Sequence, residues 1–146
     1  MKISGSKKTE YSIIDANINR AKEGLRVSED IVRFVLGSVK LSSKLKSIRH
    51  AIDRYAAAIA PDYGRLLSNR DSGSDAGRRI KNKNEFKRSG MRDILVSNFK
   101  RAQESLRVLE EMSKLTGRPS AAGFKELRYK TYEAEKDAVL AYDKNS

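Results

Sequence analysis

The sequence has no cysteine, a single histidine and only two prolines among its 146 residues. Without cysteine there is no disulfide framework, no thiolate zinc site and no cysteine nucleophile. The lone histidine, His50, excludes a metal site built from several histidines. Charged residues make up 34% of the chain, and this charge together with the scarcity of proline favours long amphipathic helices. We therefore expect an all-α protein.

Long apolar runs are also missing. No segment approaches the roughly 18 apolar residues of a membrane span, and the start MKISGSKKTEYS has no apolar signal-peptide core. We therefore expect a cytoplasmic protein with no membrane partner. The net charge of +12 indicates an anionic partner such as nucleic acid, an anionic membrane surface or a phosphorylated small molecule. Because the six tyrosines are scattered and form no stacking platform, nucleic acid is less favoured.

Apolar residues recur at helical spacing in four stretches of the chain. Gly37 and Pro61 end the first two stretches, and we expect Gly117 and Pro119 to end the third. Residues 61–90 between the second and third are rich in Gly, Ser, Asn, Asp and basic residues, which predicts a long basic loop with at most a short helical turn. The expected helices span residues 12–36, 42–60, 91–116 and 120–142.

The chain contains an internal repeat. The segment NINRAKEGLRVSE at 17–29 aligns with NFKRAQESLRVLE at 98–110, an offset of 81 residues, and eight of the 13 pairs are identical. A weaker match at an offset of 79 pairs Lys46 with Lys125 and Arg49 with Arg128. We expect one domain over 1–146, in which two pseudo-symmetric helical hairpins (about 11–60 and 91–142) form a four-helix bundle.

The repeated Asn and Arg fall on the inner side of each first helix. At 100° per residue, with Asn17 as the origin, Arg20 lies at about −60° and Asn17 lies within the apolar stripe. A buried amide needs partners, and an arginine beside it must meet an anion or reach solvent. These residues and their mates Asn98 and Arg101 would then face a shared groove. Alternatively, the asparagines bond helix ends or each other, and the arginines pair with acidic neighbours.

A third arginine of each repeat has a simpler interpretation. Arg26 has Asp30 four residues on and Glu23 three residues back, and Arg107 has equivalent neighbours. At these helical spacings the oppositely charged side chains are neighbours on one face. We expect surface ion pairs at both arginines.

The loop carries the stretch RDSGSDAGRR at 70–79. Asp71 and Asp75 lie four residues apart among glycines, which suits a magnesium ion bound to phosphate oxygens. Arg70, Arg78 and Arg79 flank them and would neutralise phosphates. The same residue types are common in ordinary turns, so the stretch alone does not decide between a site and a turn. No GxxxxGK[ST] motif is present, so a P-loop is excluded.

The stretches DANINRAKEGLRVSEDIVRFVL, RDSGSDAG and NFKRAQESLRVLEEMSKL together resemble a family of small helical proteins of thiamine biosynthesis. Its members occur alone or fused ahead of thiamine-phosphate synthase. The resemblance implies an ATP-dependent kinase, with Mg²⁺ as cofactor, that converts 4-amino-5-hydroxymethyl-2-methylpyrimidine phosphate to the diphosphate. The chain is too short for a TIM barrel, so synthase activity of its own is not expected.

The repeat, the loop and the resemblance give one set of expected site residues. Arg20, Arg101, Asp71 and Asp75 are the catalytic candidates, and the two aspartates are also the metal candidates. Expected partners are ATP, the phosphorylated pyrimidine, thiamine-phosphate synthase and a second copy of the chain. Alternative functions are a non-catalytic substrate-binding or partner module of the synthase and a nucleic-acid-binding protein. The candidates for binding substrate and phosphate are Asn17, Asn98, Arg70, Arg78, Arg79, Arg49, Arg128, Glu29 and Glu110.

Overall fold

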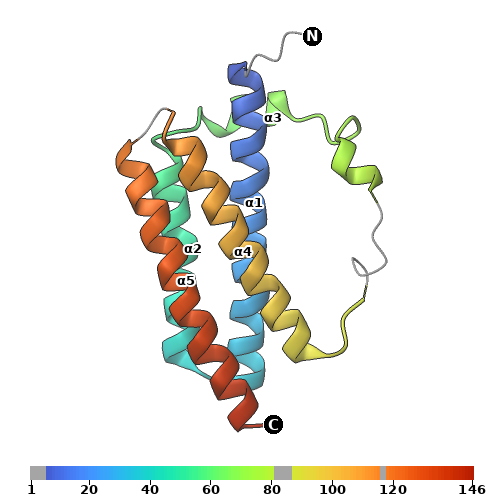
Figure 1. The fold of residues 1–146 in the computed structure, drawn as a ribbon, viewed down its shortest axis with the longest axis vertical. Coiled ribbons are helices and arrows are strands. Elements are labelled where there is room, and N and C mark those ends of the chain that lie inside the picture. The colour runs from blue at the N-terminus through green and yellow to red at the C-terminus, as the bar shows by residue number, and fades with distance from the viewer. Residues whose placement is uncertain (1–5, 81–86, 116–117) are drawn as a thin grey trace.

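A computed structural model describes residues 6–80, 87–115 and 118–146. The described residues form helices and turns and contain no strand, so the expectation of an all-α protein is confirmed. None of the described helices is both long and apolar enough to cross a membrane. The α-helices, coloured along the chain in Figure 1, are α1 (Lys7–Ile31), α2 (Val39–Ala56), α3 (Tyr63–Asn69), α4 (Met91–Ser113) and α5 (Arg118–Lys144).

Helix α1 begins five residues before the expected start at residue 12. Ser6 explains the difference, because its side chain accepts a hydrogen bond from the Thr9 amide and so caps the helix. A π-helical segment, Val32–Leu36, continues α1. The chain then turns at Gly37, whose φ of 62° is a left-handed conformation that glycine adopts without a Cβ clash. The expected end of the first helix is therefore confirmed.

The second helix and the following loop also differ in detail from expectation. Helix α2 begins at Val39, because Ser38 caps it through the Leu41 amide, and it ends at Ala56 rather than residue 60. The expected loop contains α3, capped by the Asp62 side chain, and a 3-10 turn over Ala76–Arg79. Side-chain caps and the short helix α3, which buries Leu66, therefore order part of this basic segment.

One sequence signal was assigned to the wrong helix. Pro119 was expected to end the third helix, but it lies in the first turn of α5, which begins at Arg118. Proline is accepted there because the first helical N–H groups have no intrahelical partner. Helix α4 ends earlier, at Ser113. Gly117, the other expected stop, lies outside the described residues.

Each of the four long helices contacts two others: α1 packs on α2 and α4, and α5 packs on the same two helices. Figure 1 shows α1 crossing α4, with α3 beside the first turns of α1. Gly24 sits at the α1–α4 crossing, where a Cβ would lie 2.7 Å from the Asn98 carbonyl oxygen. The shared core is apolar and includes the fully buried Leu25, Phe99 and Phe124.

Candidate functional site

An ion pair holds the loop against α1. Arg70, which follows α3, donates from Nε to Oδ2 of Asp15 at 2.6 Å and from Nη2 to Oδ1 at 2.9 Å. Asp15 is buried, and the hydrogen bond to it raises the pKa of Arg70. Leu66, the buried residue of α3, adds an apolar anchor. The two-pronged contact fixes the chain just before Asp71 in position relative to α1.

A pocket lies between the first half of α1 and this loop. Its volume is about 630 Å³, within the range of roughly 300–1,000 Å³ that is usual for small-molecule sites. Polar side chains that were not expected at a site also line it, among them Lys8, Thr9, Ser12, Asn19, Ser72 and Ser74. We call this cavity the α1 pocket. Five expected site residues line it: Asn17, Arg20, Arg70, Asp71 and Asp75.

Arg20 is the exposed cation of the α1 pocket that lies within the repeated segment 17–29. Within the described part of the chain it forms no ion pair, and neither does Lys8 on the same pocket. Asn17 is buried, as the helical wheel predicted, and its Nδ2 donates to the Ile13 carbonyl oxygen at 2.8 Å. The amide is therefore held by its own helix, and Arg20 is left available to an anion.

Asp71 and Asp75 each use one carboxylate oxygen to order the loop. Oδ1 of Asp71 accepts from the Ser74 amide at 3.2 Å, and Oδ1 of Asp75 accepts from the Gly77 amide at 2.9 Å. Both residues are exposed, and the described residues supply no hydrogen bond to either Oδ2. Among those residues no cluster of three or more carboxylates or imidazoles could hold a metal ion by itself.

The remaining expected residues of the loop and of the second repeat lie off the α1 pocket. Arg78 and Arg79 are exposed on the 3-10 turn. Asn98 repeats the contact of Asn17, because its Nδ2 donates to the Ile94 carbonyl oxygen at 2.8 Å. Arg101 is exposed, as Arg20 is, and forms no ion pair with a described residue. Their roles in binding or catalysis stay predictions.

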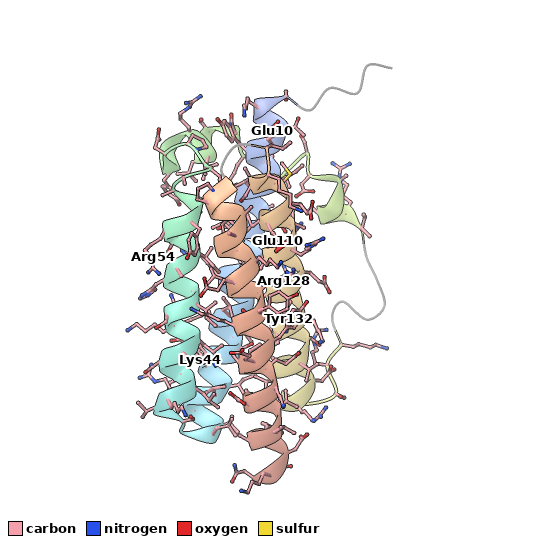
Figure 2. The ribbon with its side chains drawn as sticks, turned by 60° about the vertical axis from the view of Figure 1, so that its left-hand side comes forward. Glu10, Lys44, Arg54, Glu110, Arg128 and Tyr132 are labelled. Atoms are coloured by element: carbon pink, nitrogen blue, oxygen red, sulfur yellow. The ribbon has the colours of Figure 1, made fainter. Side chains whose placement is uncertain are left out.

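Four further expected residues pair with one another across each hairpin. Arg49 on α2 donates from Nε to Oε2 of Glu29 on α1 at 3.1 Å. Arg128 on α5 donates from Nη2 to Oε1 of Glu110 on α4 at 3.2 Å, and Figure 2 marks the two residues on these neighbouring helices. Both glutamates are buried. Their charges are thus matched within the protein, and phosphate binding by these four side chains stays a prediction.

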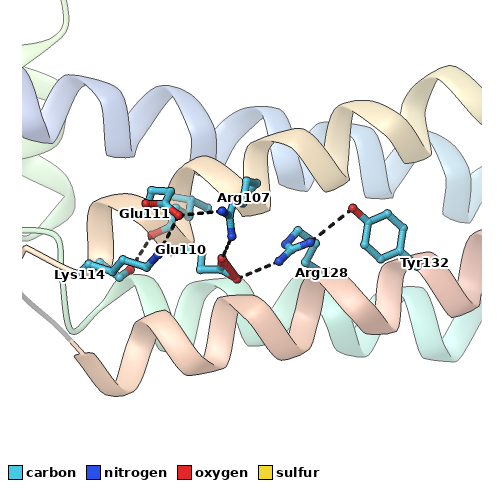
Figure 3. Close-up of polar contacts among 8 residues, drawn as sticks. Arg107, Glu110, Glu111, Lys114, Arg128 and Tyr132 are labelled. Atoms are coloured by element: carbon cyan, nitrogen blue, oxygen red, sulfur yellow. Dashed lines mark hydrogen bonds and ion pairs between the residues drawn. The ribbon is translucent and has the colours of Figure 1, made fainter.

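Two arginines contact Glu110, as two arginines contact Glu29 in the first copy. Figure 3 shows Arg107 and Arg128 both contacting Glu110, with Tyr132 on the other side of Arg128. Hydrogen bonds to Tyr132 and to Glu110 raise the pKa of Arg128, and its buried Nε has no hydrogen-bond partner among the described residues. Arg107 also pairs with Glu111 at 3.0 Å.

The expected surface ion pairs of Arg26 form only in part. Arg26 lies 3.8 Å from Asp30, as expected, but its other acidic contact is Glu29 at 3.9 Å. Among the described residues no ion pair joins Arg26 to Glu23. Buried Glu29 follows Arg26 by three residues and lies between α1 and α2, so it takes the place expected for Glu23 as a partner of the guanidinium.

The model of the ThiD2 family matches residues 12–137. This match covers most of α1 and α5, all of α2, α3 and α4, and the 70–75 loop that lines the α1 pocket. The chain belongs to the ThiD2 family. The family expected from the repeated motifs is thus confirmed, while the match does not decide whether the protein is a kinase. No solved structure matches the chain significantly.

Curated relatives of this ThiD2 family member are thiamine-phosphate synthases. The synthase of Gloeobacter violaceus is 39% identical over 127 residues, which are 87% of this chain and 36% of the relative. That of Nostoc punctiforme is 36% identical over 129 residues, 88% of this chain and 35% of the relative. That of Synechocystis sp. is 39% identical over 124 residues, with 84% and 34% coverage. The chain spans about a third of the length of these relatives.

The ThiD2 chain has one central site residue that sequence reasoning missed. Asp15 falls on the polar side of the α1 wheel, about 160° from Asn17, yet it is only 7% exposed because the loop covers it. Its partner, Arg70, stands 55 residues away, so no local spacing links the two. The one signal in the sequence was that Asp15 is the first residue of DANINRAKEGLRVSEDIVRFVL, a stretch that carries the family resemblance.

Proposed function

We propose that the α1 pocket binds the phosphorylated pyrimidine of thiamine biosynthesis and that this chain is a substrate-binding module for thiamine-phosphate synthesis. The observation that carries the proposal is the meeting of Asn17, Arg20 and the 70–75 loop in one pocket of ligand size. The family match and the names of the relatives supply the biosynthetic context. Those names favour a module of the synthase over an independent kinase.

The charges of the α1 pocket suggest how a phosphate would bind. Arg70 is neutralised by Asp15, so Lys8 and Arg20 remain as cations opposite Asp71 and Asp75. A phosphate monoester would be attracted by the two cations and repelled by the two carboxylates. The hydroxyl groups of Thr9 and Ser12 line the same pocket and can donate to phosphate oxygens. Affinity should therefore rise when the aspartates are neutralised.

Magnesium would bind in this pocket only together with the phosphorylated ligand. Two carboxylates with free Oδ2 atoms are too few to bind the ion alone, but magnesium usually takes one or two carboxylates and fills its shell with water and phosphate oxygens. Asp71 and Asp75 would hold the ion, and the ion would supply the positive charge that the carboxylates remove. The metal should therefore bind more tightly when the phosphate is present.

A kinase is the second candidate, favoured by two carboxylates and an unpaired arginine on one pocket. In this reaction a phosphate oxygen of 4-amino-5-hydroxymethyl-2-methylpyrimidine phosphate attacks the γ-phosphorus of ATP. The bond from that phosphorus to the bridging oxygen breaks, and ADP leaves. The attacking oxygen is already anionic, so no general base is required, and positioning and charge neutralisation dominate. Arg20 would stabilise the transferring group.

One titration series separates the two candidates. The full chain is titrated calorimetrically with the phosphorylated pyrimidine, with and without Mg²⁺, and is then incubated with this ligand, Mg²⁺ and ATP while ADP is measured. Binding without ADP supports the module, and ADP formed in step with pyrimidine diphosphate supports the kinase. If the ligand does not bind even at millimolar concentration, both candidates fail.

Carboxylate variants sharpen the same experiment. Asp71→Asn and Asp75→Asn should abolish the Mg²⁺ dependence of binding, and of any turnover, while the fold is retained because both side chains are exposed. Asp137→Asn is the matched control, since Asp137 is an exposed carboxylate on α5 away from the pocket. Unchanged Mg²⁺ dependence in both loop variants would refute the assignment of these aspartates.

A further inference from the structure

A second cavity adjoins the α1 pocket on the other side of the Asp15–Arg70 ion pair. Its volume is about 350 Å³ and it lies between α1, the end of α2 and α3. Because three alanines at the end of α2 and beyond contribute to it, we call it the alanine pocket. The two cavities share Asp15, Asn19, Leu66 and Arg70. The two cavities are therefore neighbours, with the Asp15–Arg70 pair lining both.

The linings of the two cavities differ in chemistry. Small and apolar residues form much of the alanine pocket, and Tyr63 stands at its rim with 67% of its surface exposed. Serine, threonine, lysine and carboxylate side chains dominate the α1 pocket instead. An apolar, planar group therefore gains more from the alanine pocket, where its surface leaves water. The residues that give this cavity its apolar character are Ile18, Ala56, Ala57, Ala60, Pro61 and Leu66.

The cations of the alanine pocket are already paired. Arg70 faces Asp15, and Nζ of Lys22 donates to Oδ1 of Asp53 at 3.0 Å. No cation of this cavity is therefore left for a phosphate, in contrast to Arg20 and Lys8 in the α1 pocket. The carboxylates of Asp15 and Asp53 can still accept a hydrogen bond from an N–H donor, because each has further lone pairs.

We propose that the alanine pocket is the subsite for the ring of the ligand, an amino-substituted aromatic heterocycle, while the phosphate of the same ligand lies in the α1 pocket. This inference rests on the proposed function. The ring packs against the alanines and Tyr63, and its exocyclic amino group donates to a carboxylate at the edge of the cavity. Arg70, held by Asp15, stands between the two subsites and sets the distance from ring to phosphate.

A bulky substitution at the alanine pocket tests the assignment. Ala57→Trp fills the cavity, and Ala58→Trp is the matched control, because Ala58 is the next exposed residue and lines neither cavity. Affinities for the phosphorylated pyrimidine and for glycerol phosphate, which has the phosphomonoester but no ring, are measured by NMR titration. We expect Ala57→Trp to weaken pyrimidine binding by at least about tenfold, a loss of roughly 1.4 kcal/mol. Its affinity for glycerol phosphate and both affinities of Ala58→Trp should not change.

Three possible results distinguish a failure of the ring subsite from a failure of the proposed function on which it rests. If the wild-type protein binds no phosphorylated pyrimidine, the proposed function fails and the ring subsite fails with it. If the wild-type protein binds but Ala57→Trp binds equally well, only the ring subsite is refuted. If Ala57→Trp loses both ligands to the same degree, the ring assignment is again refuted, because the substitution then acts on the phosphate subsite.

A second variant and a second measurement keep the test decisive if Ala57→Trp fails to fold. Tyr63→Ala removes an exposed ring and should weaken pyrimidine binding while leaving glycerol phosphate binding unchanged. In the wild-type protein, the unphosphorylated pyrimidine alcohol should shift the amide resonances of Ala57, Ala60 and Tyr63 and leave those of Ser72 and Ser74 in place. The reverse pattern would overturn the proposal.

Discussion

Arg49 on α2 and Glu29 on α1 form a hydrogen-bonded ion pair between the two helices of the first hairpin, with 3.1 Å from Nε to Oε2. The second hairpin contains the same arrangement in Arg128 and Glu110. In each pair the glutamate lies on the first helix of the hairpin, where the repeat is clear, and the arginine lies on the second helix, where the match is weaker. The two arginines matched at an offset of 79 residues therefore make equivalent contacts in the two hairpins.

Loss of Arg49 should destabilise the protein. The side chains of Glu29 and Arg49 are only 8% and 16% exposed, so Arg49→Met leaves a buried carboxylate without its main partner. We expect the free energy of unfolding to fall by about 2–4 kcal/mol, measured by urea denaturation. Arg26→Met, at a side chain that is 55% exposed, should cost at most about 0.5 kcal/mol. Equal losses in the two variants would contradict this account.

Gly24→Ala should loosen the crossing of α1 and α4. The added Cβ would stand 2.7 Å from the Asn98 carbonyl oxygen and 3.3 Å from the Ala102 amide nitrogen, both of them backbone atoms that cannot turn away. We expect a loss of about 1–3 kcal/mol in the free energy of unfolding. Helix propensity alone predicts a gain of about 1 kcal/mol. The sign measured in urea therefore decides between the two effects.

Asp15→Asn should release the loop rather than unfold the domain. Arg70 would lose its charged partner, but its side chain is 35% exposed, so the free energy of unfolding should fall by only about 1 kcal/mol. Trypsin should cut after Arg78 and Arg79 faster than in the wild-type protein, and affinity for the phosphorylated pyrimidine should fall. Asp30→Asn, a change to an exposed carboxylate of α1, serves as control. Unchanged cleavage rates in Asp15→Asn would argue against the anchor.

The two repeated arginines provide a matched pair for binding. Arg20 lines the α1 pocket and Arg101 does not, and both are exposed. Arg20→Met should weaken binding of the phosphorylated pyrimidine by about tenfold or more, whereas Arg101→Met should have a smaller effect, and neither should change stability. Calorimetric titration measures both. A larger loss at Arg101 would move the phosphate to the second hairpin.

Acid should remove one contact between α4 and α5. Arg92 donates two hydrogen bonds to Asp143 and lowers the pKa of that carboxyl below its ordinary value of 3.8. Because the folded-state pKa is the lower one, the pair stabilises the fold above pH 3.8 and loses this effect as the pH falls toward the folded-state value. Urea midpoints of the wild-type protein and Asp143→Asn should differ near neutral pH, and the difference should shrink as the pH falls below 3.8. A constant gap would contradict this.

Local rules predicted the helices better than the contacts between them. Spacing of apolar residues and the stop at Gly37 located most of α1, and the wheel placed Asn17 in its buried stripe. The beginnings of α1 and α2 were missed because Ser6 and Ser38 act as caps through single side-chain contacts. Pro119 was misassigned because proline is common both in the first turn of a helix and just after the last turn of one.

The site was predictable in its parts but not in its assembly. The composition of the loop indicated Arg70, Asp71 and Asp75, and the repeat indicated Asn17 and Arg20, so five pocket residues were named without a fold. Symmetry then suggested equal roles for Asn98 and Arg101, but the described part of the loop packs on α1 of the first hairpin. Asp15 was missed because its burial depends on this cover, which a helical wheel does not contain.

The place of the α1 pocket, on the first hairpin, bears on what the internal repeat allows. Two separate, identical hairpins could bury their apolar faces against each other in a homodimer, but every position would then be the same on both sides. Here Asp15 anchors the loop while the equivalent position in the second copy is Val96, and Gly24 corresponds to Ser105. Because both hairpins belong to one polypeptide, equivalent positions can differ in this way, and the proposed ligand site needs to be built on only one of them.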